Sequence, residues 1–212
     1  MAYNLTYTSK ERPAAPFAAV PNYKKDLSGP AQPPNTGVPM TRHHIIPYST
    51  LKNYWNALLA QGRFGDLRLV LGEIARTMGR YRLNFNDAER SGVAELARSI
   101  STETHDPGAT GKPKFYDGLM QVYCWLPGNL FLGPKARSDD PGEGFDRAAG
   151  LLGLSWYGQL VRAYDSMQRY TTDPSGGNAV ASALCRTVKR QDYAPVDAKR
   201  WTLSQGTYRI TG

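Results

Sequence analysis

Residues 42–47 read RHHIIP, and this short stretch contains two of the three histidines in the 212-residue chain. The apolar residues around the pair predict an extended segment that ends at Pro47. Neighbouring residues on a strand point to opposite sides, so His43 and His44 would approach a shared site from two directions. One imidazole could bind a divalent metal while the other accepts a proton, because its unperturbed pKa is about 6.5. The alternative is one solvated histidine beside one core histidine.

A second stretch, WLPGNLFLGP at residues 125–134, contains an Asn-Leu step at Asn129. Three apolar residues follow the asparagine and a Gly-Pro pair closes the run, which predicts a short strand over residues 130–132. The preceding segment, residues 119–125, is mostly apolar and contains neither glycine nor proline, so it is either a helix or a strand. Cys124 within it is interpreted as a buried structural cysteine.

Four carboxylates follow in SDDPGEGFD at residues 138–146. Carboxylate oxygen suits Mg²⁺ or Mn²⁺, and a mixed set of imidazole and carboxylate ligands also accepts Zn²⁺ or Ni²⁺. Asp140 and Glu143 equally fit the first turn of a helix, with Asp140 as its N-cap. That alternative leaves Asp139 unexplained, so Asp139 is the slightly better candidate metal ligand and Asp140 is the next.

Helical spacing governs much of the remaining chain. Apolar residues at this spacing predict helices over residues 51–59, 67–78, 151–170 and 178–190. Asn86 and Glu89 predict a capping box at the start of a further helix that continues to Ile100. Residues 104–114 predict a loop, and Gly206 marks the turn of a C-terminal hairpin.

The N-terminal segment, residues 1–41, predicts an extended lead or linker, because seven prolines lie between residues 11 and 41. The lead could lie on the folded body formed by residues 42–212. No apolar run reaches the roughly 18 residues of a membrane helix, and the N-terminus lacks the apolar region of a secretory signal. We therefore expect no membrane anchor.

The net charge of +8 is distributed along the chain rather than concentrated in a tail. Spread positive charge is typical of a surface that binds a polyanion such as nucleic acid, although simple solubility is the alternative. Two cysteines without a CxxC pair fit a reducing compartment. The absence of GxxxxGK[ST], GxGxxG and GxSxG motifs argues against phosphate-loop, dinucleotide-binding and α/β-hydrolase chemistry.

The HHIIP run followed by the Asn-Leu step resembles the HNH nucleases of the His-Me finger (ββα-metal) superfamily. The resemblance implies that His43 binds the metal, that His44 is the general base and that Asn129 orients His44. The usual final histidine ligand is absent after Asn129, and Asp139 or Asp140 is its expected substitute.

Three further residues were weighed as candidates. Arg42 and Arg137 are candidate nucleic-acid-binding residues, and for Arg137 an ordinary surface arginine is the alternative. The third histidine, His105, is interpreted as a surface residue of a loop.

The resemblance also implies an α+β fold, with a helix-rich domain around a ββα-metal core. Residues 48–118 would be a long helical insertion between two antiparallel core strands, and Asp140 would start the core helix. The implied activity is metal-dependent hydrolysis of phosphodiester bonds, with DNA as the expected substrate.

The HHIIP form is similar to nuclease domains of bacterial toxins, which implies an antagonistic toxin or effector with an acidic immunity protein as partner. The chain would then act in the cytoplasm or be delivered into a target cell without a secretory signal. A non-catalytic basic protein that binds nucleic acid or a protein partner is the alternative function.

Overall fold

The two neighbouring histidines lie at the end of strand β2 (Met40–His44), which pairs antiparallel with β4 (Leu130–Pro134). The register sets His43 opposite Phe131 and His44 opposite Leu130, as the antiparallel pairing expected for these stretches requires. All five residues of β4 are buried, which explains why its sequence is continuously apolar instead of alternating.

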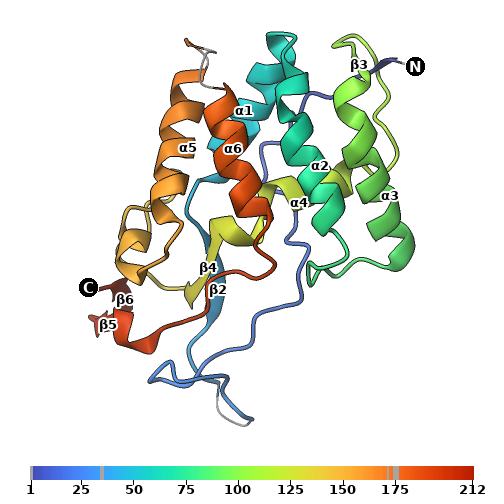
Figure 1. Ribbon diagram of the computed structural model, residues 1–212. Helices are drawn as coiled ribbons and strands as arrows, with labels where there is room; N and C mark the ends of the chain where they lie inside the picture. Colours follow the sequence, from blue (N-terminus) through green and yellow to red (C-terminus); the bar gives the residue numbers. More distant parts are fainter. Residues whose placement is uncertain (1, 34–35, 171, 174–176) are drawn as a thin grey trace.

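The computed structural model describes residues 2–33, 36–170, 172–173 and 177–212, and in these residues the fold is mixed α/β (Figure 1). The helices between the two paired strands are α1 (Tyr48–Ala60), α2 (Arg68–Thr77), α3 (Asp87–Ser99) and α4 (Tyr116–Cys124). After β4 come α5 (Tyr157–Tyr170) and α6 (Gly177–Val188). Short 3₁₀ helices cover Phe64–Leu67, Ile100–Thr102, Pro127–Asn129, Ala148–Leu152 and Ala198–Arg200.

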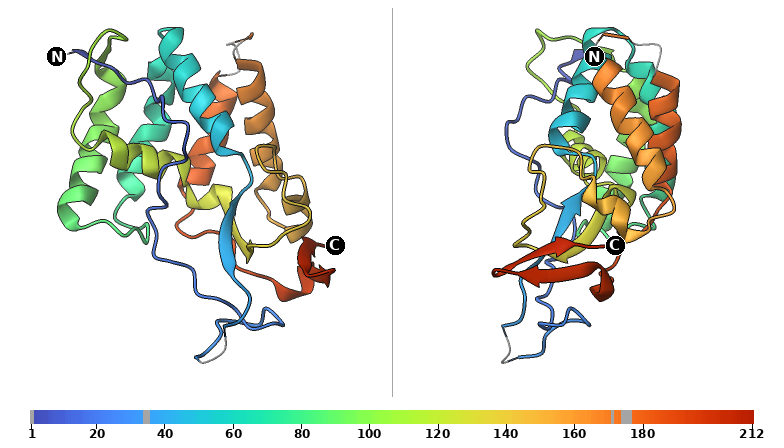
Figure 2. Two further views of the ribbon diagram at one scale, coloured as in Figure 1. Left: turned by 180° about the vertical axis from the view of Figure 1, so that it is seen from behind. Right: turned by 90° about the vertical axis from the view of Figure 1, so that its left-hand side faces the viewer.

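The helices form a layer in which α5, α6, α2 and α3 stand side by side (Figure 1). Helices α1 and α4 pack behind this layer, and the N-terminal segment runs along their outer side (Figure 2). Large aromatic side chains fill the space between the layers, including Tyr54, Trp55, Tyr81, Tyr116, Tyr123 and Tyr170. None of the helices in the described part of the chain has the length and apolarity needed to span a membrane.

Most of the predicted helices are confirmed, with small shifts at their ends. The capping box at α3 is present, with Asn86 Oδ1 accepting from the Glu89 amide at 2.9 Å and the Glu89 carboxylate accepting from the Asn86 amide at 2.8 Å. Of residues 119–125, ambiguous in sequence, all but Trp125 belong to α4, and Trp125 caps its C-terminal end. The helix predicted from residue 151 begins only at Tyr157, because the chain leaves its 3₁₀ turn at Gly153 with a φ of +70°.

The expected helix starting at Asp140 is wrong: the described residues between β4 and α5 contain only the 3₁₀ turn Ala148–Leu152. Asp140 Oδ1 accepts the Gly142 amide at 2.9 Å, and this turn continues through Gly142 at a φ of +59°. An Asx turn followed by a left-handed residue directs the chain away from a helix, although Asp140 does use one oxygen in the way that an N-cap would.

The N-terminal lead is part of the packed body instead of a free linker; Met1 and residues 34–35, including the Pro34 of its proline run, lie outside the described residues. Strand β1 (Ala2–Tyr3) pairs parallel with β3 (Thr104–His105). Leu5 is fully buried, and its carbonyl accepts hydrogen bonds from Trp55 Nε1 and the Tyr116 hydroxyl. The lead therefore follows the helical layer from one end to the other and then enters β2 (Figure 1).

The predicted C-terminal hairpin consists of β5 (Trp201–Ser204) and β6 (Thr207–Ile210). Its two turn residues, Gln205 and Gly206, have φ values of +50° and +79°, the pattern of a turn whose twist suits a two-residue hairpin loop. The hairpin packs on β4: a side chain at Gly133 would place its Cβ 2.5 Å from the Trp201 ring. The close approach of Trp201 therefore requires glycine at position 133 of β4, the strand that pairs with the strand of His43.

Candidate active site

The ring of His44 has both nitrogens engaged, and the partners define its tautomer. Nε2 lies 3.0 Å from the Cys124 carbonyl, which can only accept, so Nε2 carries the hydrogen. Nδ1 lies 3.0 Å from Arg12 Nη1, which can only donate, so Nδ1 presents a lone pair. Burial, aided by the charge of Arg12, lowers the pKa of His44 and keeps the ring neutral. His44 is therefore held as a neutral ring whose Nδ1 lone pair faces Arg12.

Asn129 fixes the backbone just after the histidine pair. Its Oδ1 accepts the Ile46 amide at 2.8 Å and its Nδ2 donates to the Ile46 carbonyl at 2.9 Å. Its own carbonyl accepts the Ile45 amide at 2.9 Å, and the residue is only 1% exposed. The resemblance implies that Asn129 orients His44; in the structure its side chain bonds to the backbone of Ile46, two residues after His44.

His43 lies on the opposite side of β2 and faces Asp140. Its Nε2 is 2.9 Å from the Pro134 carbonyl, so that nitrogen carries the hydrogen and Nδ1 has a lone pair in the neutral ring. Nδ1 is 3.2 Å from Asp140 Oδ2. Burial lowers the pKa of His43, and the nearby Arg137 charge acts in the same direction against the weaker effects of Pro134 and Asp140. Two acceptors therefore face each other at hydrogen-bond distance.

The separation of these two acceptors is close to that of two ligands on one divalent cation. Ligands about 2.1 Å from a metal and roughly at right angles are about 3 Å apart, close to the separation of Nδ1 and Oδ2. Among the described residues, no group of three or more His, Cys, Asp or Glu side chains is close enough to hold a metal. A cation here would have two protein ligands and complete its coordination with water and substrate oxygens, an arrangement common for Mg²⁺.

Asp139 and Arg137 belong to a buried network beside the pair. Arg137 Nη1 donates to Asp146 at 2.7 Å and Arg137 Nε donates to Asp139 at 3.0 Å. The second oxygen of Asp139 accepts the Ile210 amide at 2.9 Å, so both of its oxygens are occupied. The contacts thus bring Asp140, and not Asp139, to His43, and they turn the Arg137 guanidinium inward instead of toward a substrate phosphate.

The two histidines open into a cavity of about 230 Å³. Its lining includes His43, His44, Asp140, Arg12, Arg42, Tyr48, Lys135 and Glu143. Arg42 contributes to the wall, but its guanidinium lies between the Phe17 and Tyr193 rings, 5.0 and 4.7 Å from their centroids, and donates to the Ala18 carbonyl. The cavity combines a neutral base, a candidate cation site and exposed cationic side chains.

Arg12 is the site residue that sequence reasoning missed. It lies in the proline-rich lead, and no local pattern there indicates a partner in β2. Its guanidinium carbon lies 5.3 Å from the centroid of the Trp125 ring. The Trp125 and His44 rings are in edge-on contact, with their centroids 4.5 Å apart. Hydrogen bonds hold the chain on both sides of Arg12, from Tyr48 and Lys52 to the Ser9 carbonyl and from Trp125 Nε1 to the Pro13 carbonyl.

Two other candidates lie outside the cavity. His105 is half-buried in β3, where its Nδ1 accepts the Leu5 amide at 3.2 Å, so it braces the lead instead of standing free on a loop. Cys124 is fully buried, as predicted, and burial raises the pKa of its thiol. A neutral buried thiol is a poor nucleophile.

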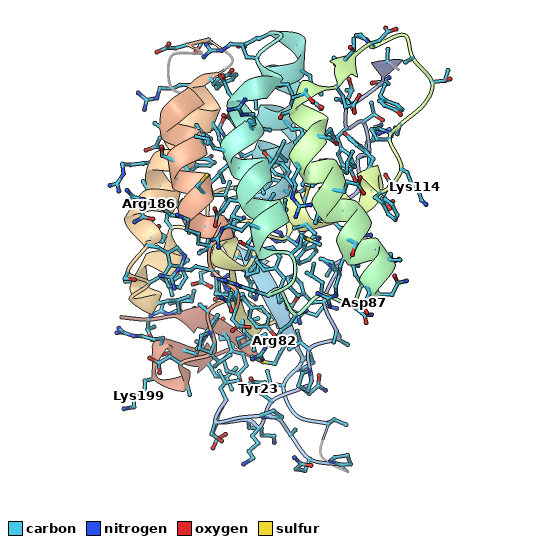
Figure 3. All side chains as sticks on the ribbon, turned by 45° about the vertical axis from the view of Figure 1, so that its right-hand side comes forward. Tyr23, Arg82, Asp87, Lys114, Arg186 and Lys199 are labelled. Atoms are coloured by element: carbon cyan, nitrogen blue, oxygen red, sulfur yellow. The ribbon has the colours of Figure 1, made fainter. Side chains whose placement is uncertain are left out.

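Basic residues lie on several sides of the molecule. Figure 3 shows Lys114 beside α4, Arg186 on α6 and Lys199 next to the hairpin, at well-separated positions. This distribution agrees with the spread of charge along the sequence and provides cationic surface beyond the cavity.

Comparison with known proteins gives one relative to report. Protein p9 of Acyrthosiphon pisum secondary endosymbiont phage 1 is 30% identical over 148 residues. The match covers 61% of this chain and 39% of the phage protein, so the chain spans well under half the length of that relative. No protein-family model matches the chain, and no solved structure matches it.

Proposed function

We propose that this protein is a metal-dependent endonuclease that hydrolyses phosphodiester bonds in nucleic acid, with DNA as the expected substrate. The observation that carries the proposal is the geometry of the neighbouring histidines. His44 presents Nδ1 as a base, while His43 and Asp140 face each other with unshared acceptors. Both features open into one cavity, whose lining also includes the basic residues Arg12 and Lys135 and the acidic residues Glu143 and Asp146.

In the proposed reaction, His44 Nδ1 removes a proton from the attacking water. The charge that develops on the ring is stabilised by the Cys124 carbonyl, which accepts from Nε2 at 3.0 Å. Asn129 keeps the backbone after His44 in place through its two bonds to Ile46, so the base need not reorganise during the reaction. A divalent cation held by His43 and Asp140 would stabilise the negative charge on the phosphate and the leaving oxygen.

Arg12 positions the phosphate in this proposal. A phosphate oxygen is a stronger partner for a guanidinium than a neutral imidazole is, because the hydrogen bond is then charge-assisted on both sides. Substrate entry would draw Arg12 from His44 Nδ1 to the phosphate, which frees the lone pair when it is needed. Arg12 is exposed, and its guanidinium can make this short movement while its neighbours stay anchored.

The proposal treats β2 and β4 as the strands of a ββα-metal core and residues 48–118 as the insertion between them. The segment from Asp140 to Leu152 takes the place of the core helix that the resemblance implies. An antagonistic toxin or effector role, with an acidic immunity protein as partner, stays a prediction of that resemblance.

Hydrolysis of bis(4-nitrophenyl) phosphate tests the cavity without requiring nucleic-acid binding. We expect release of 4-nitrophenolate in Mg²⁺ or Mn²⁺, and its loss when EDTA is added. A chain that releases no nitrophenolate above background with Mg²⁺, Mn²⁺, Zn²⁺ or Ni²⁺ would contradict the proposed chemistry.

The metal ligands are tested by calorimetric titration with Mn²⁺. We expect His43→Ala and Asp140→Ala each to weaken Mn²⁺ binding by more than about tenfold, because each removes one of two protein donors. Asp139→Ala is the matched control: it should leave Mn²⁺ affinity nearly unchanged while lowering the free energy of unfolding, since Arg137 and the Ile210 amide lose their acceptor. If Asp139→Ala weakens Mn²⁺ binding more than Asp140→Ala does, the metal ligand is Asp139 instead.

The role of Arg12 is tested by two substitutions. Arg12→Ala should raise the KM for nucleic acid by about tenfold to a hundredfold, the value of one or two charge-assisted hydrogen bonds. Arg12→Lys should recover only part of the loss, because an ammonium lacks the two-pronged geometry of guanidinium. If Arg12→Ala cleaves faster than the parent protein, the arginine blocks the base instead of holding the phosphate.

A further inference from the structure

A second cavity, of about 700 Å³, lies beside the candidate active site. Its lining includes Leu203 and Tyr208 of the hairpin, Val38 and Pro39 before β2, and two exposed lysines, Lys25 and Lys135. Most of this surface is apolar, whereas the cavity at the histidines is lined largely by polar and charged groups. We call the second cavity the hairpin groove.

The apolar character of the hairpin groove follows from the strand alternation of the hairpin. Trp201, Leu203, Tyr208 and Ile210 lie on one face, since Trp201 pairs with Ile210 and Leu203 with Tyr208. Three of them are buried against the body, but Leu203 is 58% exposed. Tyr208 is fixed by its hydroxyl, which donates to the Lys25 carbonyl at 3.2 Å. The apolar face of the hairpin is therefore covered at Trp201, Tyr208 and Ile210 and exposed to solvent at Leu203.

The hairpin groove adjoins the candidate active site. Lys135 lines both cavities, and its amide donates to the Pro39 carbonyl at 2.8 Å. The residue before it, Pro134, provides the carbonyl that accepts from His43 Nε2. A nucleic-acid strand bound at the histidines would therefore meet the groove at Lys135.

We propose that the hairpin groove binds a nucleobase adjacent to the scissile phosphate, and that the substrate is nucleic acid with an unstacked, single-stranded segment at the cleavage position. This inference rests on the proposed nuclease function. An apolar surface beside basic residues accepts an unstacked base without regard to its sequence; here Leu203 offers the exposed apolar contact, and Lys25 and Lys135 can bind the flanking phosphates. The bases of an intact duplex are stacked and paired, and they enter such a groove only after extrusion.

A protein segment is a poorer fit to the same features. The two lysines of the groove favour a polyanion, and one of them also serves the cavity in which a phosphate is expected. The other, polar face of the hairpin contains Arg209. Its positive charge would repel a basic peptide.

Fluorescence anisotropy of the full chain in EDTA tests the groove without cleavage. The probes are a labelled single-stranded DNA and an oligonucleotide of the same length with abasic sites in place of bases. We expect the base-containing strand to bind about tenfold tighter, the range expected for stacking one base. Leu203→Asp should remove this preference. Leu69→Asp, which changes a leucine that is 69% exposed on α2, should keep it and corrects for the added charge.

The outcomes separate the two proposals. Equal affinity for both strands, or an unchanged preference in Leu203→Asp, overturns the groove proposal even if bis(4-nitrophenyl) phosphate is hydrolysed. A base preference that depends on Leu203, without diester hydrolysis, supports the groove and contradicts the nuclease chemistry. A change in sedimentation coefficient caused by Leu203→Asp alone, with no base preference in the parent chain, would assign the groove to contact between protein chains and overturn the proposal.

Discussion

Replacing His44 with alanine is expected to reduce phosphodiester hydrolysis by a factor of about 10²–10⁴, the usual contribution of a positioned general base. The reason is that Nδ1, once Arg12 has moved to the phosphate, is the ring nitrogen that can take a proton, and alanine provides no substitute. The fold should survive, because the half-buried ring gives up one bond to a carbonyl and one to the exposed Arg12. Single-turnover cleavage of a labelled DNA measures the effect.

Two controls make the His44 result specific. Binding of DNA by His44→Ala in EDTA should match that of the parent chain, since phosphate affinity is spread over many basic residues. His105→Ala removes a histidine outside the cavity and should retain cleavage. Substantial cleavage by folded, pure His44→Ala would contradict the assignment of the base.

Replacing Asn129 with alanine should produce the largest loss of stability among the site residues, about 2–5 kcal/mol. The change leaves the amide and the carbonyl of Ile46 without partners in a buried position, and each such group costs about 1–3 kcal/mol. Asn129→Asp keeps the acceptor for the Ile46 amide but loses the donor. Its carboxylate would also be buried beside the Ile46 carbonyl, so we expect a loss of similar size. Denaturant unfolding measures both variants.

The activity of the Asn129 variants distinguishes positioning from folding alone. Below the unfolding transition, Asn129→Ala should lower kcat more than it raises KM, because a displaced base harms the chemical step and not the binding of phosphate. A change in the free energy of unfolding below about 0.5 kcal/mol, the range of neutral surface substitutions, would show that the two bonds to Ile46 are not important.

The parts of the fold that the sequence predicted are those determined locally. The capping box of α3 depends on two residues three positions apart, and the hairpin turn depends on Gly206. The Asn129 contact was expected only because the resemblance connected two distant stretches. The strand pairing that brings Asn129 to Ile46 joins residues 83 positions apart, which periodicity alone does not indicate.

The parts that the sequence did not predict depend on the tertiary path of the chain. Arg12 reaches His44 only because the lead packs along α1 and α4, and a proline-rich segment carries no sign of that route. Arg137 resembles any surface arginine until Asp146 and the hairpin enclose it. The helix expected at Asp140 failed because an Asx turn and a left-handed glycine use the same residues that favour a helix start.

The choice between Asp139 and Asp140 shows the same limit in a single pair of residues. Both aspartates suit a metal by residue type, and the helix-cap argument favoured Asp139. The structure engages Asp139 through Arg137, two residues earlier in the same loop, and through Ile210 of β6, and leaves Asp140 Oδ2 facing His43. Adjacent residues in a turn can differ completely in environment, and composition does not resolve them.

The central claim is that the cavity at His43 and His44 hydrolyses phosphodiester bonds with the help of a divalent cation. The most direct test incubates the purified chain with supercoiled plasmid in Mg²⁺ and, in parallel, with EDTA, with His44→Ala as the background control. The account predicts nicked plasmid in Mg²⁺, because negative supercoiling favours locally unwound segments, and intact supercoiled plasmid with EDTA and with His44→Ala. Supercoiled plasmid that persists with Mg²⁺, Mn²⁺, Zn²⁺ and Ni²⁺, yet is retarded in a gel by the protein, would contradict the account and identify a non-catalytic nucleic-acid-binding protein.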